Sequence, residues 1–308
     1  MKRLIVAILA VTLTAAAFAA WGLAAPSSGT GAAAPGAKAQ VPKLPALPPD
    51  VKQNKRWRIG IKCDFPPFGF IDVQGKNGGY EVDIARRFAQ LAFGRTNRVS
   101  LTCTTTASRI PTLTSQRVDI IISTLTWTAS RAEQIDFSIP HYSATGRLLV
   151  KNDSNVQTLN DLRGKNVVTT RGSIYATWMR NCLKEANILE VDGTAASVLA
   201  VKDGRADAFM FDDAFVLGVA TQDRELKLTN DRFLAVPWGI GIRKGDDATA
   251  RWVNAALRRM KAKDEFNAIL RRNTPARFVS SFLGNVPRPR NNFQYPVGKD
   301  PASDCTQG

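Results

Sequence analysis

Short apolar runs alternate with longer amphipathic segments through the middle of the chain. Runs that predict strands, because they alternate or are continuously apolar between turn residues, cover residues 58–63, 98–103 and 118–122. Between the first two, Ile84, Phe88 and Leu91 recur on one face at helical spacing. Between the second and third, Pro111 suits the first turn of a helix. This order of strands and helices predicts a parallel, doubly wound sheet.

The second half of the chain repeats this pattern. Predicted strands cover residues 146–150, 166–170 and 206–211, and predicted helices cover residues 174–183 and 195–202. The extended segment 233–242 could carry the chain back toward the first unit. A single helix is predicted over residues 248–270. From Gly284 the chain is rich in proline and asparagine, which predicts an irregular tail.

A hydroxyl-rich turn, residues 124–131, follows the third predicted strand and leads into a helix. Thr128 suits the N-cap of that helix, because its side-chain oxygen can accept from a free backbone N–H. Thr124 and Thr126 offer hydroxyl and backbone groups at the end of the strand. Arg131 carries a planar fork of donors that suits a carboxylate. Taken alone, the stretch equally describes a surface arginine after an ordinary strand–helix turn.

The ligands of doubly wound sheets gather at the carboxyl ends of the strands. Six polar residues fall at that edge: Lys62, Thr106, Arg109, Thr124, Thr126 and Arg131. Three of them are cationic, and converging cations repel one another unless an anion lies between them. The convergence therefore predicts a site for a small acid. Arg109 could instead pair with Asp119 or Glu81.

The second unit offers a similar edge. Arg171, Gly172 and Ser173 form a turn into a helix, whose free backbone N–H groups suit an anion. The last strand of this unit ends at Asp212 and Asp213. Asp212 could serve a ligand or simply cap the following helix.

The ordered set of motifs resembles the solute-binding proteins that serve polar amino acid transporters. The matching pieces are residues 65–70 (FPPFGF), 79–85 (GYEVDIA), 108–111 (SRIP), 118–121 (VDII), Thr126 with Arg131, 136–138 (DFS), 161–165 (DLRGK), 207–208 (DA) with 212–213 (DD), and 239–240 (GI). The resemblance spans the chain from residue 56 to about residue 270. It implies that one amino acid binds in a cleft between two lobes and is delivered to an ABC transporter.

The resemblance also implies a fold class: an α/β, two-lobed, periplasmic-binding-protein-like (type II) fold. Each lobe would be a mostly parallel sheet flanked by helices, and two crossing strands would join the lobes. The expected division is 56–143 and 238–285 for the first lobe, 144–237 for the second and 286–308 for an irregular C-terminal tail.

On the family pattern, five residues hold the groups that all amino acids share. Arg131 pairs with the α-carboxylate of the ligand, together with Thr126 and Ser173. The main chain of Thr124 and the carboxylate of Asp212 take the α-amino group.

The resemblance implies that six further residues of the protein contact the side chain of the ligand. They are Lys62, Phe65, Thr106, Arg109, Arg171 and Thr194. In the glutamate- and aspartate-binding branch the positions of Lys62, Thr106 and Arg109 are basic or hydroxylic. The aromatic residue usual at the position of Thr106 is absent, which disfavours a stacked aromatic ligand. The resemblance therefore implies an acidic amino acid, glutamate or aspartate.

Two other functions are compatible with the same fold. Some relatives are dehydratases that act on cyclic acids, but such chemistry needs a positioned general acid or base, and His141 is the only histidine. The chain could also be a ligand-sensing module that a partner protein reads. The favoured interpretation involves no enzyme activity and no cofactor; the expected partner is an ABC transporter permease, and the protein is expected to be monomeric.

The composition and charge of the chain limit the classes of partner that it is expected to bind. The 308 residues carry a formal net charge of +16, which favours anionic partners. The basic residues are scattered, and no basic run is interleaved with aromatic residues, so no nucleic-acid partner is predicted. With one histidine and no C-x-x-C spacing, a metal site is not expected.

The N-terminus predicts export. Lys2 and Arg3 precede an apolar run over residues 4–20 that ends in small residues, as in a signal peptide over residues 1–25. An uncleaved anchor is the alternative, because the apolar stretch continues to Ala25. Residues 26–55 are rich in alanine and proline and predict a linker. No cysteine precedes Cys63, so the protein is expected to be periplasmic or secreted without a lipid anchor.

The four cysteines permit two disulfides in an exported protein. Cys63 and Cys103 would lie near the ends of adjacent parallel strands, where a bond between them can form. Cys182 and Cys305 would then join the tail to the second lobe. The alternative is that some of the thiols remain free.

Overall fold

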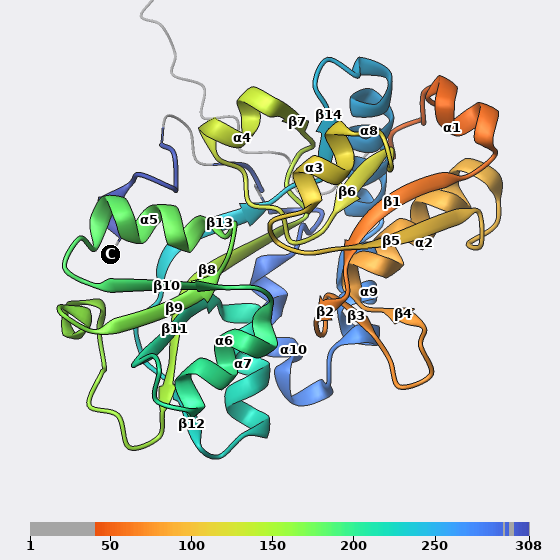
Figure 1. Cartoon of the computed structure of the whole chain (residues 1–308). Coiled ribbons are helices and arrows are strands. Elements are labelled where there is room, and N and C mark those ends of the chain that lie inside the picture. Colours follow the sequence, from red (N-terminus) through yellow and green to blue (C-terminus); the bar gives the residue numbers. More distant parts are fainter. Residues whose placement is uncertain (1–40, 292, 296–298, 308) are drawn as a thin grey trace, which may run out of the picture. The chain divides into compact units, whose positions relative to one another are not determined.

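The computed structural model describes residues 41–291, 293–295 and 299–307, which belong to one compact unit, Ala39–Gly308. The predicted signal peptide and the first part of the predicted linker lie outside the described residues. None of the helices in the described part of the chain is long and apolar enough to cross a membrane. Two main β-sheets, each with helices packed against it, make up the described unit (Figure 1).

The first sheet has the strand order β5-β1-β6-β14-β7. These strands are β5 (Val99–Thr104), β1 (Trp57–Lys62), β6 (Ile120–Ile122), β14 (Gly241–Arg243) and β7 (Ile135–Phe137). β1 pairs in parallel with both β5 and β6, as the apolar pattern predicts, and β14 runs antiparallel to β6 and β7. The helices of this lobe, lobe 1, are α1 (Pro49–Asn54), α2 (Tyr80–Phe93), α3 (Arg109–Thr114), α4 (Ala129–Gln134), α8 (Asp247–Ala262), α9 (Glu265–Asn273) and α10 (Ala276–Phe282). A small antiparallel sheet accompanies them, made of β2 (Asp64–Phe65), β3 (Gly69–Ile71) and β4 (Asn77–Gly78).

The second sheet, the centre of lobe 2, has the strand order β10-β9-β11-β8-β12, and β13 also pairs with β8. Its strands are β8 (Tyr142–Lys151), β9 (Asn166–Thr170), β10 (Asn187–Val191), β11 (Ala208–Asp212), β12 (Leu226–Leu228) and β13 (Phe233–Trp238). Its helices are α5 (Ile174–Cys182), α6 (Thr194–Lys202) and α7 (Asp213–Gln222), and Leu159–Leu162 forms a short 3-10 helix, η1. Two further 3-10 turns, η2 (Leu283–Asn285) and η3 (Cys305–Gln307), follow α10.

β8 and β13 are the two strands that connect the lobes. They pair antiparallel, with Tyr142 opposite Trp238 and Ala144 opposite Val236. Each strand leads directly into an element of lobe 1 at its other end: β7 precedes β8, and β14 follows β13. We propose that the lobe boundaries lie at residues 143/144 and 237/238, where these strands run side by side.

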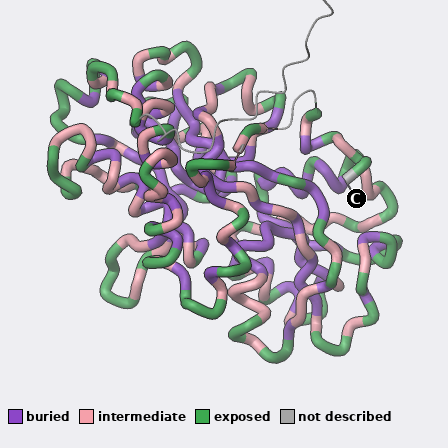
Figure 2. Tube along the Cα trace, turned by 180° about the vertical axis from the view of Figure 1, so that it is seen from behind, coloured by how far each residue is buried: buried purple, intermediate pink, exposed green. Residues whose placement is uncertain are grey.

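An aromatic cluster fills the junction of the lobes. Phe68 lies edge-on to Tyr142 and Trp238, with ring centroids 4.6 Å and 5.1 Å away, and all three side chains are fully buried. Phe65 of β2 reaches Phe211 of β11 at 5.7 Å, so the cluster is continuous with the core of lobe 2. Burial follows the strands and the inner faces of the helices, and exposure is greatest in the connecting loops (Figure 2).

Two predictions about local structure need correction. The sequence predicts a linker over residues 26–55, but α1 occupies Pro49–Asn54, because Val51 is buried against the core and prolines begin the helix.

The helix predicted over residues 248–270 is two helices, α8 and α9. The chain turns between them at Asp264, whose φ of 55° is left-handed and whose carboxylate accepts from Arg288. No glycine or proline marks that break in the sequence.

Both predicted disulfides are confirmed. Cys63 and Cys103 are joined at the ends of the adjacent strands β1 and β5, with their Cα atoms 5.5 Å apart. Cys182, the last residue of α5, is joined to Cys305, with Cα atoms 5.2 Å apart. The second bond attaches the C-terminal tail to lobe 2.

Candidate functional site

The parallel register of lobe 1 brings the predicted polar residues to one edge of the sheet. Lys62, the last residue of β1, lies opposite Thr104 of β5, and Ile61 lies opposite Ile122 of β6. The segments that continue from β5 and β6 therefore begin beside Lys62. They carry the buried side chains of Thr106 and Thr124.

The ammonium of Lys62 is buried and has two partners, the buried Thr106 and the partly exposed Asp64. Its Nζ lies 2.7 Å from Asp64 Oδ1 and donates to Thr106 Oγ1 at 3.2 Å. Burial lowers the pKa of Lys62, and the negative charge of Asp64 opposes that shift. Asp64 was not among the predicted site residues, although it follows Lys62 by two positions.

Arg109, the first residue of α3, carries a buried guanidinium. Its Nη1 donates to the carbonyls of Ser123 and Thr124, at 2.8 Å and 2.9 Å. Burial lowers its pKa to about 9, and the nearby charge of Arg131 acts in the same direction. Among the described residues, no carboxylate forms an ion pair with Arg109. It is therefore a buried cation whose hydrogen bonds go to neutral carbonyls.

The carboxylates considered as alternative partners of Arg109 are engaged elsewhere. Asp119 accepts from the Arg58 side chain at 3.0 Å. Glu81 accepts from the N–H of Thr124 through both oxygens, at 2.8 Å and 3.0 Å, and lies 3.0 Å from Nε2 of His141. Thr124 has a φ of 45°, a costly conformation for a β-branched residue, which the Glu81 contact stabilises.

Arg131 lies on α4 and contacts both lobes. Thr128 caps this helix as predicted, because its Oγ1 accepts from the N–H of Arg131. The Arg131 guanidinium donates to the carbonyl of Thr126 at 2.7 Å and to the carbonyl of Gly172 in lobe 2 at 3.0 Å. Burial lowers its pKa to about 10, opposed by the negative charges of Asp212 and Asp300.

Lobe 2 contributes a buried carboxylate. Asp212, the last residue of β11, accepts a hydrogen bond from Tyr175 at 2.8 Å. Burial raises its pKa to about 7, against the opposing effects of the Tyr175 hydrogen bond and of the positive charges of Arg109 and Arg131. Tyr175 was not predicted, although its position in the first turn of α5, two residues after Ser173, could have indicated it.

Two lobe 2 residues, Thr194 and Gly172, lie close to lobe 1. The hydroxyl of Thr194 donates to the carbonyl of Asp64 at 2.9 Å. A side chain at Gly172 would place its Cβ 2.9 Å from Cα of Ala107, so only glycine permits this approach. Ser173 is buried, and its hydroxyl lies 2.9 Å from that of Thr169.

Two predicted pocket residues are placed differently. Arg171 is exposed and pairs with Asp192 at 3.0 Å, so its guanidinium does not join those of Arg109 and Arg131. Phe65 has no exposed surface, since its ring packs among Phe68, Phe211, Phe215 and Trp238. It is part of the aromatic cluster at the junction of the lobes.

The edge thus holds three cations, Lys62, Arg109 and Arg131, with the Asp212 carboxylate close to both arginines. This arrangement complements a zwitterion that carries a carboxylate toward the guanidiniums and an ammonium toward Asp212. Among the described residues, no group of histidine, cysteine, aspartate and glutamate side chains is arranged to hold a metal ion.

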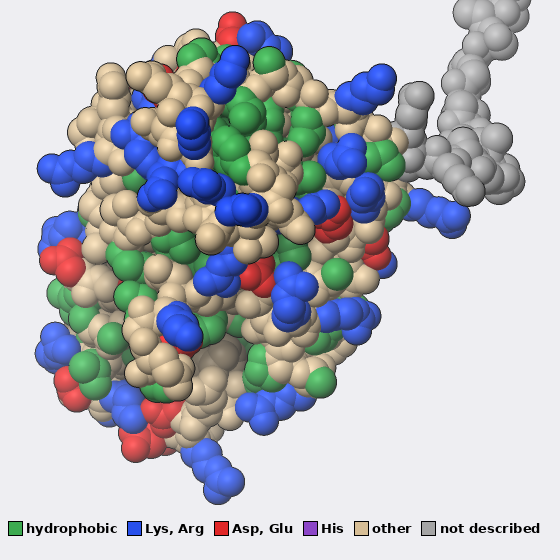
Figure 3. All heavy atoms as spheres, turned by 90° about the vertical axis from the view of Figure 1, so that its right-hand side faces the viewer, with side chains coloured by type: hydrophobic (Ala, Val, Ile, Leu, Met, Phe, Trp, Pro, Cys, Tyr) green, Lys and Arg blue, Asp and Glu red, His purple; other side chains and the backbone are tan. Residues whose placement is uncertain are grey.

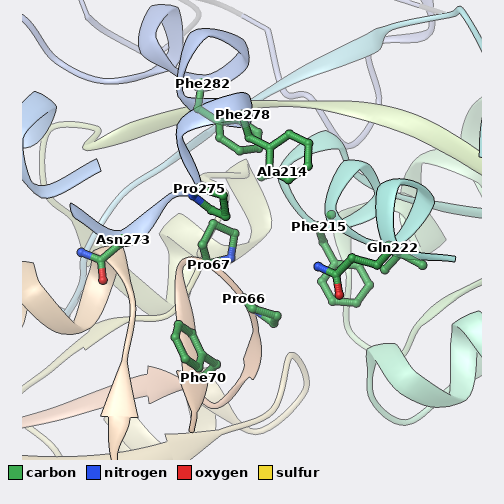
Figure 4. A pocket seen from close by; sticks show the side chains of 12 residues that line it. Pro66, Pro67, Phe70, Ala214, Phe215, Gln222, Asn273, Pro275, Phe278 and Phe282 are labelled. Carbon is green, nitrogen blue, oxygen red and sulfur yellow. The ribbon is translucent and has the colours of Figure 1, made fainter. Parts of the chain in front are cut away.

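A separate cavity of about 350 Å³ lies between the β2–β3 turn, α7 and α10 (Figure 4). Its walls are mainly apolar and include Pro67, Phe70, Phe215 and Phe278. Among the described residues that line it, Asn273 and Gln222 carry the only polar side chains, so a zwitterion would lose its hydration there without charged partners. This cavity is not the candidate site.

The paired α/β lobes, two connecting strands and polar residues from both lobes at one junction define a two-lobed binding protein. The chain belongs to the bacterial extracellular solute-binding proteins, family 3, whose sequence pattern matches residues 57–275.

Two curated relatives illustrate the range of the family. The chain is 31% identical to the ABC transporter glutamine-binding protein GlnH of Bacillus subtilis over 224 residues, which cover 72% of this chain and 82% of the relative. It is 27% identical to an L-glutamate/L-aspartate-binding protein of Pseudomonas aeruginosa over 264 residues, or 81% and 84% of the two chains.

Solved structures have the same fold. The cysteine-binding protein of Campylobacter jejuni aligns with a TM-score of 0.69 and 27% identity, covering 74% of this chain and 92% of that one. The solute receptor for L-cysteine of Neisseria gonorrhoeae gives a TM-score of 0.73 and 25% identity, covering 77% and 96%. These relatives are solute-binding proteins rather than enzymes, and the chain is a member of that class.

Proposed function

We propose that this protein binds one acidic amino acid, glutamate or aspartate, between its lobes and delivers it to an ABC transporter. The observation that carries the acidic assignment is Arg109, a buried guanidinium that lacks an ion pair among the described residues. A buried cation that lacks a directly paired carboxylate is costly, and a ligand carboxylate would offset that cost.

The groups common to all amino acids have partners in two lobes. Arg131 would pair with the α-carboxylate, and its existing contacts with Thr126 and Gly172 hold the guanidinium at the lobe junction. Asp212 would pair with the α-ammonium. A ligand that contacts Arg131 and Asp212 together favours the closed arrangement of the lobes, because only that arrangement offers both partners.

The side-chain carboxylate of the ligand would face Lys62, Thr106 and Arg109. Lys62 already has Asp64 as a counterion, so the discrimination between charged and neutral side chains falls mainly on Arg109. Glutamine is the second candidate, because the Lys62–Asp64 pair offers a donor and an acceptor that suit a neutral amide. The glutamine-binding relative also supports this alternative.

A thermal-shift panel of the twenty amino acids tests this proposal. Glutamate and aspartate should raise the melting temperature most, with an effect that grows with ligand concentration. In Arg109→Gln, affinity for glutamate should fall about 10- to 100-fold, corresponding to about 1.5–3 kcal/mol for a charged hydrogen bond, while affinity for glutamine changes less. Arg58→Gln, which removes an arginine that is paired with Asp119, is the matched control.

Larger stabilisation by arginine or lysine than by glutamate would contradict the acidic assignment. Equal losses of glutamate and glutamine affinity in Arg109→Gln would show that Arg109 stabilises the backbone of Ser123 and Thr124 but does not discriminate between the two ligands.

Export by a cleaved signal peptide, residues 1–25, belongs to the same proposal and is supported by the extracellular character of the family. The mature protein from the producing cell should lack these residues when its intact mass is measured. A mass that includes Met1 and the apolar segment would favour the uncleaved anchor instead.

The strong positive charge has no assigned role in ligand binding. Lys and Arg side chains occur across much of the face shown in Figure 3, with Asp and Glu side chains between some of them. Their spread agrees with the scattered distribution of basic residues along the sequence.

A further inference from the structure

The C-terminal segment Asp300–Cys305, here named the C-terminal strap, is attached to α5 of lobe 2. The disulfide Cys182–Cys305 joins it covalently to the end of that helix. Two hydrogen bonds add to this attachment: Trp178 Nε1 donates to the carbonyl of Asp304 at 3.1 Å, and Asn181 Nδ2 donates to the carbonyl of Ala302 at 2.9 Å. Ala302 is buried.

The other end of the strap contacts lobe 1. Asp300 Oδ2 accepts from the N–H of Ala129, the first residue of α4, at 3.2 Å, and Asp300 Oδ1 accepts from the N–H of Ala302 at 2.9 Å. Nearby, the Tyr295 hydroxyl donates to the carbonyl of Ser138 at 2.7 Å, and its ring lies 6.0 Å from that of Trp127.

The attachment points are close together along the chain. Ala302, bonded to α5, follows Asp300, bonded to α4, by two residues, which span at most about 7 Å when fully extended. The lobes can therefore separate at this place only if one contact breaks. The lobe 2 end is fixed by a covalent bond, so the Asp300–Ala129 hydrogen bond is the weaker one.

The contact with lobe 1 falls on the helix that carries the proposed carboxylate-binding arginine. Ala129 precedes Arg131 by two residues in α4, and the charge of Asp300 also acts on Arg131. Arg131 itself reaches Gly172 of lobe 2. The strap and a ligand held by Arg131 would thus stabilise the same closed arrangement.

We propose that the C-terminal strap is a third connection between the lobes, and that Asp300 is a positioning residue that holds α4, and with it Arg131, against lobe 2. Opening of the cleft detaches Asp300 from α4, and the disulfide keeps the strap in place for the next closure. The effect on ligand release rests on the proposed function; the effect on α4 in the ligand-free protein does not.

The test compares Asp300→Ala, the double variant Cys182→Ser/Cys305→Ser and their combination with the unaltered protein. Glutamate release, followed by stopped-flow tryptophan fluorescence, should be about 3- to 10-fold faster in Asp300→Ala and in the double variant. In the combined variant, the fold increase in release rate should be smaller than the product of the two separate increases, because both changes act through one strap. In the ligand-free protein, hydrogen exchange of the Ala129 amide should accelerate by a similar factor.

Two further variants separate positioning from general destabilisation. Asp300→Asn keeps one oxygen that can accept from Ala129 but loses the acceptor of the Ala302 N–H, so it should restore part of the slow release. Ser303→Ala alters an exposed strap residue and should release glutamate at the unaltered rate.

Unchanged release and unchanged α4 exchange in Asp300→Ala would overturn the strap while leaving the proposed function intact. Faster α4 exchange in a protein that binds no amino acid would support the strap and reject the proposed function.

Discussion

Arg131→Ala should lose amino acid binding by about 100- to 4,000-fold, because removal of one partner of a buried charge pair costs about 3–5 kcal/mol. The side chain supplies two donors at the junction of the lobes, which bond to the carbonyls of Thr126 and Gly172. Titration calorimetry with glutamate measures the loss. Arg131→Lys should recover only part of the affinity, since a lysine keeps the charge but not the planar fork.

Arg171→Ala is the matched control for Arg131→Ala. Arg171 comes from the same predicted set of ligand residues, but it is exposed and paired with Asp192. Its removal should change affinity by less than about twofold, as expected of an exposed ion pair. Tight glutamate binding retained by Arg131→Ala would reject the assigned carboxylate site.

The affinity for the amino acid should fall as the pH drops below about 7. Burial raises the pKa of Asp212 to about 7, and the ligand ammonium binds the ionised carboxylate. Below that pH, binding must release the proton of Asp212, so the dissociation constant should rise about tenfold for each pH unit. Calorimetry at about pH 7.5, 6.5 and 5.5 in two buffers of different ionisation enthalpy measures both the affinity and the proton release.

Asp212 should affect the stability of the ligand-free protein with the opposite sign. Its folded pKa lies above the ordinary value near 4, so the folded state binds more protons between about pH 4 and pH 7. This group therefore stabilises the ligand-free fold as the pH falls through that window. Asp212→Asn should bind weakly and with little pH dependence; an unchanged pH dependence would assign the effect to another group.

The lobe 1 half of the site follows from the sequence because it depends on local pattern and sheet register. Three apolar runs predict parallel strands, and parallel strands bring Lys62, Thr106 and Thr124 to one edge. Asp64 could have been included by the same reasoning, since residues two apart in an extended chain point to the same side.

Contacts between lobes could not be predicted from local pattern. Thr194 meets Asp64, and Arg131 meets Gly172, only when separate sheets come together. The same limit explains Arg171, which follows a strand in the expected place but points toward Asp192. The α8–α9 break also lacks a sequence marker, because it depends on a left-handed aspartate and its tertiary partner Arg288.

The most direct test of acidic amino acid binding is a calorimetric comparison of glutamate and glutamine on the unaltered protein at neutral pH. The two ligands share their α-groups and differ in the charge that would face Arg109 and Lys62. Glutamate is expected to bind at least about tenfold more tightly than glutamine, which corresponds to about 1.4 kcal/mol. Tighter binding of glutamine would contradict it.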